Sequence, residues 1–363
     1  MARRQKLVQF GAGSIGRGFI AQLFHQAGWE VVFVEASLSF AGQLRDRGSY
    51  RILEVGEAGE VETQVSDFRV LDASDTIEVA AEASTADLLS TAIGLSNLPG
   101  LAPVVADALT LRQDPLDILI CENGATAAED FRQAVLASSL GRELAPFGCV
   151  RTSIGRMAPV NLVGADPLDV RVEPYRHLPV EAAAFTGPIP QVEGLEPKPD
   201  FTLVLRQKLY LHNLSHAVLA YVGIRRGHLT VPQAIADPEL REWMRKASGE
   251  AIEAMAFAHG STPERQEEIR KESWAILDDL ERRYANTALG DTLERVARDP
   301  IRKLAPDDRL VGAARLCLEQ GIQPVWILKA IEQALLYECG PDDPSREEWS
   351  KMGVEGRRCW VMT

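Results

Sequence analysis

The stretch KLVQFGAGSIGRGFIAQLFHQAG, residues 6–28, decides the fold. Its first part, 6–13, is a short apolar run that predicts a strand, and 15–28 is an amphipathic run that predicts the helix after it. The turn between them carries the pattern Gly-x-Gly-x-x-Gly. Glycine at these positions permits a tight bend, close approach of a pyrophosphate and close packing of the helix on the strand. The stretch therefore predicts an α/β domain that binds a dinucleotide.

The chemistry of this predicted site favours NAD. A second strand is predicted at 31–37 and carries Glu35 near its end. A carboxylate there can accept hydrogen bonds from both adenosine ribose hydroxyls and repels a 2′-phosphate, while the N–H groups that begin the first helix face the phosphates. The residues expected to contact the cofactor are Gly11, Gly13, Ser14, Ile15, Gly16, Glu35, Thr91, Ala92, Gly94 and Asn123.

Other interpretations of these residues stay open from the sequence. The glycine-rich turn could belong to an α/β protein that binds no dinucleotide, with Glu35 as a solvated strand end. Asn123 ends another predicted strand, so its side chain could enter a ligand cleft or simply form a turn. Arg17 could contact a phosphate or be exposed.

Strand–helix alternation continues through the first half of the chain. Further strands are predicted at 87–94 and 117–123, each next to an amphipathic segment. This alternation predicts a doubly wound, mostly parallel sheet of the Rossmann type. Residues 51–65 and 169–175 have the alternating pattern expected of antiparallel excursions on that sheet.

The pattern changes near residue 200. TGPIPQVEGLEPKPD at 186–200 is rich in proline and glycine and predicts a linker. Beyond it the periodicity is helical almost throughout, and three Asp-Pro or Thr-Pro pairs mark expected helix starts. We therefore predict two domains, an NAD-binding Rossmann-type domain at 1–197 and an all-α substrate and catalytic domain at 198–363.

Composition excludes several classes of protein. The 363 residues are 46% apolar and 25% charged, which is typical of a globular chain of two domains. A net charge of −13 disfavours non-specific nucleic-acid binding. No apolar run reaches the ~18 residues that suggest a membrane span. We expect a small-molecule partner, no nucleic-acid or membrane partner, and a monomer or weak dimer.

Cysteine usage points to a reducing compartment. The five cysteines are odd in number and far apart, and none forms a CxxC pair. This spacing disfavours a disulfide framework and a structural zinc site. We therefore expect a cytoplasmic protein without a metal ion.

The first helix of the second half carries the residues best suited to chemistry. At about 100° per residue, Tyr210, Leu211 and Leu214 fall on one side, which predicts a core-facing stripe. The other side offers one ammonium, an amide, a hydroxyl and two imidazoles, from Lys208, Asn213, Ser215, His212 and His216. These groups suit hydroxyl binding, although most polar helix faces are simply solvated.

A basic cluster follows in the run LERVARDPIRKLAPDDRL. Its cations are Arg295, Arg298, Arg302, Lys303 and Arg309. Arginine recognises phosphate through its planar fork, so the cluster predicts an anion site for a phosphorylated substrate. The alternative is a charged surface turn in which the neighbouring aspartates and Glu294 neutralise the cations.

With these residues in hand, the chain resembles the polyol-specific long-chain dehydrogenases. The Lys–Asn–His spacing on one helix is specific to that family, and the basic run resembles its mannitol-phosphate branch. The segments that carry the resemblance are FGAGSIGRGF (10–19), TAIG (91–94), ICEN (120–123), DPLDVRVEPY (166–175), Lys208-x4-Asn213-x2-His216 and RVARDPIRKLAPDDRL (295–310).

The resemblance implies metal-independent hydride transfer between NAD and a sugar alcohol, here D-mannitol 1-phosphate and D-fructose 6-phosphate. It implies that Lys208 is the general acid/base and that His216 positions the substrate. Asn123 and Asn213 would donate hydrogen bonds to the reacting oxygen. A lysine suits the role when burial and a nearby positive charge disfavour its ammonium form.

By the same resemblance, Arg295 and Lys303 reach the polyol chain, and we assign the phosphate to Arg302 and Arg309. The substrate would then lie in a crevice between the two halves of the chain. One departure concerns the segment SIGRMAP, which has Gly155 where the family commonly has an aspartate.

Two other functions remain compatible with the sequence. One is the same chemistry on an unphosphorylated substrate, as in mannitol 2-dehydrogenase or the uronate reductases. The other is a protein that binds NAD without catalysis.

Overall fold

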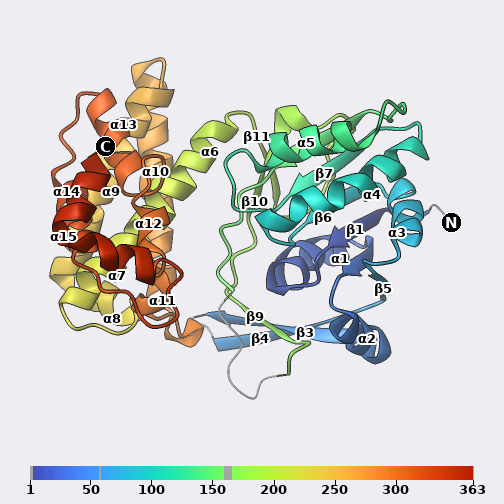
Figure 1. Cartoon of the computed structure of the whole chain (residues 1–363), viewed down its shortest axis with the longest axis horizontal. Coiled ribbons are helices and arrows are strands. Elements are labelled where there is room, and N and C mark those ends of the chain that lie inside the picture. The colour runs from blue at the N-terminus through green and yellow to red at the C-terminus, as the bar shows by residue number, and fades with distance from the viewer. Residues whose placement is uncertain (1–2, 57–58, 159–165, 363) are drawn as a thin grey trace. The chain divides into compact units, whose positions relative to one another are not determined.

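The structure is a computed structural model that describes residues 3–56, 59–158 and 166–362. The chain divides into two compact units, Met1–Phe201 and Thr202–Thr363. The first unit is α/β and the second is helical, which confirms the predicted fold class (Figure 1). The predicted domain boundary after residue 197 lies a few residues before this division.

The first unit is built on six parallel strands in the order β5-β2-β1-β6-β7-β8. These strands are β1 Lys6–Phe10, β2 Glu30–Glu35, β5 Phe68–Asp72, β6 Leu88–Thr91, β7 Leu116–Ile120 and β8 Phe147–Arg151. The order reverses between β1 and β6, and the carboxyl ends of strands at such a reversal form the ligand crevice of this class of fold. The doubly wound sheet is confirmed, although β5 and β8 were not predicted.

Helices cover both faces of this sheet. On one face, β1, β2, β6 and β7 pack against α3 Thr76–Ser84, α4 Leu98–Thr110 and α5 Ala127–Ser138. On the other face, α1 Ala21–Gln26 buries Leu23 and Phe24 against Leu7 and Leu88. Because the strands are buried on both faces, they are almost continuously apolar.

A second sheet of three strands has the order β4-β3-β9. It pairs β3 Ser49–Gly56 with β4 Gly59–Ser66 in antiparallel register and with β9 Val170–Val172 in parallel register. The prediction that these segments extend the main sheet is therefore wrong. Their apolar side packs, together with α2 Leu38–Arg47, on the β2 side chain Phe33, so these strands bury their apolar residues as a separate layer.

The prediction that residues 186–200 form a linker is also wrong. This segment contains β11 Leu195–Lys198, which pairs in parallel with β10 Leu178–Glu181. Upstream, the backbone N–H groups of Thr186 and Gly187 donate to the carboxylate of Asp117. Its prolines and glycines thus shape a segment that is packed onto the first unit and does not act as a free tether.

The second unit consists of helices around a buried centre. α7 is apolar on almost every side, as expected of a helix surrounded by others. The helices are α6 Phe201–Gln207, a π-helical segment Lys208–Asn213, α7 Leu214–Arg225, α8 Val231–Ala236, α9 Pro238–His259, α10 Pro263–Tyr284, α11 Leu293–Ala297, α12 Pro300–Lys303, α13 Val311–Glu319, α14 Val325–Leu335 and α15 Arg346–Met362. Three short 3₁₀ turns span Leu95–Asn97, Ala182–Ala184 and Thr287–Leu289.

The helix starts predicted from proline are confirmed. α9, α10 and α12 begin at Pro238, Pro263 and Pro300, where the missing N–H removes no helical hydrogen bond. Thr262 caps α10 through its side chain. Within the described part of the chain, no helix combines the length and apolarity needed to cross a membrane.

Candidate active site

The glycine-rich turn has the close contacts that its pattern predicts. Gly11 has φ +87°, and a Cβ there would lie 2.4 Å from the carbonyl oxygen of Ala92. A Cβ on Gly16 would lie 2.0 Å from the carbonyl oxygen of Gly11. Gly13 differs, because nothing lies within 4 Å of the place where its Cβ would stand. The turn is therefore closed toward the protein and open at Gly13, which is the shape that a pyrophosphate requires.

The helix behind the turn starts in an unusual way. Gly16–Ile20 is a π-helical turn, and α1 follows it directly. No acidic side chain lies in this first turn. The N–H groups at the start of a helix lack internal partners, so those after Gly13 are available to an anion.

Glu35 lies at the end of β2 beside this turn. Its Oε2 accepts from the backbone N–H of Ala12 at 3.0 Å, and its Oε1 accepts from that of Ser37 at 2.9 Å. Each carboxylate oxygen keeps capacity for a further hydrogen bond. The fixed carboxylate therefore fits a ribose diol next to the phosphate turn, and the residues present fit NAD.

Arg17 is not exposed, and its guanidinium binds backbone carbonyls. Its side chain is buried and donates to the backbone carbonyls of Ala12 and Leu168. Its guanidinium lies over the rings of Phe40 and Tyr50. Burial lowers the pKa of Arg17 to about 10. The exposed alternative offered from the sequence is therefore wrong, and Arg17 holds the backbone of the turn through the carbonyl of Ala12.

The next two strand ends lie beside this site. Gly94 follows β6 with φ +87°, and Asn123 lies exposed just beyond β7. Glu122 links the two loops, because its carboxylate accepts from the backbone N–H groups of Ile93 at 2.7 Å and Gly94 at 3.0 Å. Thr91 is fully buried, and its Oγ1 has no hydrogen-bond partner among the described residues.

In the second unit, the helix with the proposed catalytic residues departs from α-helical geometry. Lys208–Asn213 is a π-helical segment, closed by a hydrogen bond from the N–H of Leu214 to the carbonyl of Leu209. In such a turn residue i+5 lies close to alignment with residue i. The segment therefore turns Asn213 toward the side of Lys208, whereas an α-helix would separate them. The phase assigned to Asn213 at about 100° per residue is therefore wrong, whereas the predicted core-facing residues Tyr210, Leu211 and Leu214 are buried.

His216 lies between the ring of Tyr284 and the carboxylate of Asp291, whose Oδ2 is 3.3 Å from Nε2 of His216. Its imidazole stacks on the Tyr284 ring with centroids 4.8 Å apart. The Tyr284 hydroxyl in turn lies 2.8 Å from the carbonyl of His212 and 2.9 Å from the hydroxyl of Ser215. Ser215 therefore supports the helix from the inside and does not belong to a polar face open to ligand.

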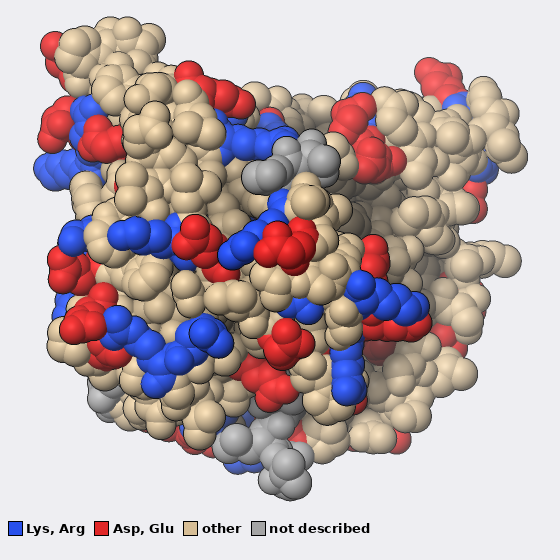
Figure 2. All heavy atoms as spheres, turned by 60° about the vertical axis from the view of Figure 1, so that its left-hand side comes forward, with Lys and Arg blue, Asp and Glu red and all other residues tan. Residues whose placement is uncertain are grey.

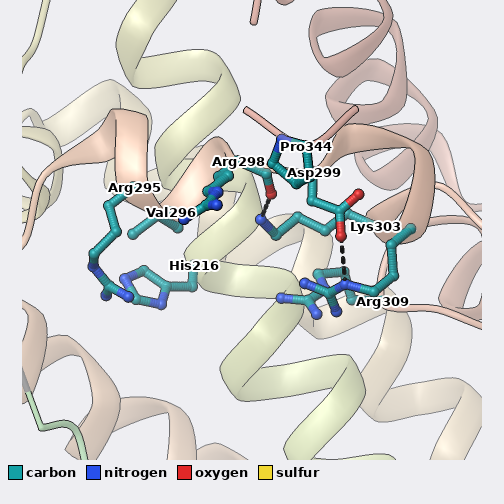
Figure 3. A pocket seen from close by; sticks show the side chains of 9 residues that line it. His216, Arg295, Val296, Arg298, Asp299, Lys303, Arg309 and Pro344 are labelled. Atoms are coloured by element: carbon teal, nitrogen blue, oxygen red, sulfur yellow. Dashed lines mark hydrogen bonds and ion pairs between the residues drawn. The ribbon is translucent and has the colours of Figure 1, made fainter. Parts of the chain in front are cut away.

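Beside His216 lies a pocket with a volume of about 370 Å³ (Figure 3). Figure 3 shows Arg295 next to the imidazole on one side and Lys303 with Arg309 on the other. All lining residues belong to the second unit: His216, Arg295, Val296, Arg298, Asp299, Arg302, Lys303, Arg309 and Pro344. The pocket thus unites five cations of the basic run with the last member of the Lys–Asn–His set. Lys208 and Asn213 are not among its lining residues.

Three of the five cations already have an acidic partner. The guanidinium of Arg295 lies 2.6 Å from Asp291, that of Arg302 lies 2.9 Å from Asp299, and that of Arg309 lies 2.7 Å from Asp308. The ion pairs expected of a charged turn are therefore present, and the anion site stays a prediction for the pocket that the same cations line. Each arginine has five N–H donors, so pairing with one carboxylate leaves donors for a ligand.

Lys303 is the buried cation of the pocket. Its ammonium donates to the backbone carbonyl of Arg298. Burial, together with the nearby charges of Arg309 and Arg302, lowers the pKa of Lys303 to about 7. An anion in the pocket would favour its charged form.

Figure 2 shows the charged side chains on one face of the molecule. There, acidic and basic side chains are intermingled. With a net charge of −13, an anion site on this protein has to be formed by local groups.

Sequence reasoning missed three residues of these sites, because Glu122, Tyr284 and Asp291 contact the predicted residues only through the fold. Arg298 was named in the basic run without a role of its own, and it lines the pocket. Among the described residues, no group of three His, Cys, Asp or Glu side chains could hold a metal ion.

The Gly155 departure has a local explanation. A Cβ at this position would lie 3.1 to 3.4 Å from ring atoms and the hydroxyl of Tyr175. The tyrosine thus occupies space next to the backbone where a larger side chain would extend. Arg156, the next residue, is buried and pairs with Glu54.

Comparison with known families covers nearly the whole chain. The profile described as "Mannitol dehydrogenase Rossmann domain" matches residues 5–194, and that described as "Mannitol dehydrogenase C-terminal domain" matches residues 204–351. The resemblance found in the sequence is therefore confirmed.

Individual relatives are similar to this chain over almost its whole length. Mannitol-1-phosphate 5-dehydrogenase of Halalkalibacterium halodurans is 34% identical over 97% of this chain and 93% of its own. The enzyme of the same name from Paenarthrobacter aurescens is 35% identical over 94% of this chain and 89% of its own.

Two solved structures share the fold. Pseudomonas fluorescens mannitol 2-dehydrogenase, in complex with NAD and D-mannitol, has a TM-score of 0.74 and 17% identity and covers 97% of this chain and 84% of its own. A substrate-free D-sorbitol dehydrogenase has a TM-score of 0.75 and 18% identity and covers 93% of this chain and 83% of its own.

Proposed function

This chain belongs to the mannitol dehydrogenase family, and from that premise we propose that it interconverts D-mannitol 1-phosphate and D-fructose 6-phosphate with NAD. Relatives about one-third identical over almost the whole chain carry the name of that activity. The observation that carries the choice of a phosphorylated substrate is the pocket, which presents five cations and one carboxylate. The N–H donors that these cations keep after pairing suit a phosphate, which arginine can meet with two parallel hydrogen bonds, better than a neutral polyol.

Within the pocket we assign the phosphate to Arg302 and Arg309, with Arg298 as a third donor. The side chain of Arg298 has no acidic partner within ion-pair distance among the described residues, so its full charge is available. Arginine can meet phosphate oxygens with two parallel hydrogen bonds. Arg295 and Lys303 would then contact the hydroxyl groups of the polyol chain.

Lys208 is proposed as the general acid/base. During oxidation its neutral amine accepts the proton of the carbinol hydroxyl, and during reduction its ammonium returns that proton to the oxygen. Asn213 donates its amide N–H to the same oxygen and stabilises its negative charge. The same role for Asn123, which belongs to the first unit, stays a prediction from the sequence. Bound NAD supplies the hydride acceptor and NADH the hydride donor. On this account the protein needs no metal ion.

The cofactor preference follows from the first unit. The turn at Gly13 leaves room for the pyrophosphate, and Glu35 accepts from the ribose hydroxyls. We further infer a cytoplasmic location. None of the five cysteines, all of which lie in the described part of the chain, forms a disulfide, which fits a reducing compartment.

The test is NADH consumption with four substrates supplied separately: fructose 6-phosphate, fructose, tagaturonate and fructuronate, each with and without EDTA. The proposal expects fast consumption with fructose 6-phosphate alone, and no effect of EDTA. Equal rates with fructose would move the assignment to a free-polyol dehydrogenase. A preference for either uronate would move it to a uronate reductase.

A further inference from the structure

We propose that Asp291 is a positioning residue of this active site, which fixes both the hydrogen-bonding form of His216 and the direction of Arg295. The proposal rests on the function given above for the pocket that these two residues line. It gives the site a carboxylate that touches no substrate itself but determines how two substrate-binding groups are presented.

The carboxylate of Asp291 lies between the two side chains and is 9% exposed. Its Oδ1 accepts from Nε of Arg295 at 2.6 Å and lies 2.6 Å from Nη2 of the same guanidinium. Its Oδ2 lies 3.3 Å from Nε2 of His216. That second contact is within ion-pair distance but falls outside regular hydrogen-bond geometry among the described residues.

The backbone around Asp291 is held at several points. Gly290 before it has φ +62°, a conformation that glycine adopts without strain. The carbonyl of Asp291 accepts from the N–H of Val231 at 3.0 Å. Thr292 after it caps α11 through its side chain. Because the backbone of Asp291 is restrained, the position of its carboxylate is fixed. The side chains of His216 and Arg295 therefore orient toward it.

The imidazole of His216 is restrained from its other side as well. Tyr284 stacks on it at an interplanar angle of 24°, which limits rotation of the ring. Burial lowers the pKa of His216, so the ring is neutral near pH 7. Despite burial, the contacts with His216 and Arg295 hold the pKa of Asp291 below its usual value, so the carboxylate is charged.

A neutral imidazole carries one proton, and an adjacent anion decides which nitrogen bears it. The negative charge beside Nε2 favours the proton there. Nδ1 of His216 is then left as an acceptor. Arg295, tied through Nε and Nη2, keeps Nη1 as a donor. The pair thus offers one acceptor and one donor, which matches a sugar hydroxyl that donates to His216 and accepts from Arg295.

The chain contains a matched control for this arrangement. Asp237 also contacts a histidine and an arginine in the second unit, with Oδ2 3.1 Å from Nε2 of His228 and 3.0 Å from Nη1 of Arg226. None of these three residues lines the pocket. Asp237→Asn therefore removes the same kind of carboxylate away from the active site.

The experiment compares the wild type, Asp291→Asn, Asp291→Glu and Asp237→Asn. Steady-state kinetics with fructose 6-phosphate and NADH binding are measured for each protein. Nitrogen-15 NMR of the histidine rings reports the tautomer of His216, assigned with His216→Gln. For Asp291→Asn we expect kcat/KM to fall about 10- to 100-fold, the typical effect of losing an orienting partner. NADH binding should stay unchanged, and the proton should move from Nε2 to Nδ1.

Asp291→Glu restores the charge and should recover part of kcat/KM, and Asp237→Asn should match the wild type. The proposal is overturned by an unchanged kcat/KM in Asp291→Asn, by an equal loss in Asp237→Asn, or by a wild-type His216 protonated on Nδ1. The wild-type spectrum decides the last point even where a variant fails to fold. Absence of any wild-type activity with fructose 6-phosphate would instead refute the proposed function, while the tautomer remains measurable.

Discussion

The glycine-rich turn of the first unit and the basic pocket of the second both suit anions, but they do so by different means. The turn offers backbone N–H groups made accessible by the open space at Gly13. The pocket offers side-chain cations, three of which carry an aspartate partner. Backbone recognition depends on a fixed spacing of glycines, whereas side-chain recognition depends on which acids and cations the fold brings together.

The largest expected effect is a loss of turnover without a loss of NADH binding at the glycine-rich turn. Lys208→Ala should lower turnover with fructose 6-phosphate by about 10²- to 10⁴-fold, the usual contribution of a general acid/base. NADH binding, measured by fluorescence titration, should remain that of the wild type because the turn is untouched. Lys271→Ala, at an exposed position of α10, is the control and should lose nothing. Turnover that survives in Lys208→Ala would show that the base is assigned wrongly.

The pocket should respond to the substrate's phosphate. Arg309→Gln removes charge-assisted hydrogen bonds that each contribute about 1.5–3 kcal/mol. KM for fructose 6-phosphate should therefore rise about 10- to 100-fold, with little change for fructose. Arg315→Gln, exposed on α13, serves as the control. A similar rise for both sugars would remove Arg309 from the phosphate site.

In the glycine-rich turn, the effect of an added methyl group on stability should depend on whether it is placed on Gly16 or on Gly13. Gly16→Ala puts a Cβ 2.0 Å from the carbonyl oxygen of Gly11, and such overpacking costs about 1–3 kcal/mol. We expect a lower Tm and about tenfold weaker NADH binding. Gly13→Ala meets no atom within 4 Å, so its Tm should be unchanged and only NADH binding should weaken. Identical Tm values for the two variants would contradict the contacts described here.

The smallest effect concerns pH. Lys303 has its pKa lowered to about 7, so it loses its proton as the pH rises through neutrality and regains it as the pH falls. KM for fructose 6-phosphate should rise a few-fold from pH 7 to pH 9, a range in which the phosphate itself is already doubly charged. Lys303→Met should raise KM at pH 7 and flatten this dependence. An unchanged pH profile in that variant would assign the dependence to another group.

The same contrast explains how much the sequence could predict. The Rossmann-type sheet, the helical second unit and the phosphate turn follow from local patterns, because strand–helix alternation and glycine spacing are local. The strands β5 and β8 were missed. The segment 186–200 was misassigned as a linker because its many prolines and glycines outweighed Val192 and Leu195, the two apolar residues that are buried. Composition does not reveal whether a turn-rich segment finds a surface to pack on.

The pocket shows the limit of sequence reasoning most clearly. Its cations were visible as a run, but the partners of His216 come from other helices and loops, with Tyr284 at the end of α10 and Asp291 before α11. The π-helical segment at Lys208–Asn213 was invisible, because an assumed α-helix assigns each residue a phase without testing its hydrogen bonds. Such contacts are tertiary, and no spacing along the chain encodes them.

The central claim is that hydride passes directly from NADH to the ketone carbon of a phosphorylated sugar, with Lys208 supplying the proton. The most direct measurement is incubation of fructose 6-phosphate with NADH deuterated at the transferable position of the nicotinamide ring, followed by NMR of the product. The account predicts mannitol 1-phosphate carrying deuterium on C5 with the wild type, and essentially no product with Lys208→Ala. Product without deuterium, or equal labelling by both proteins, would contradict it.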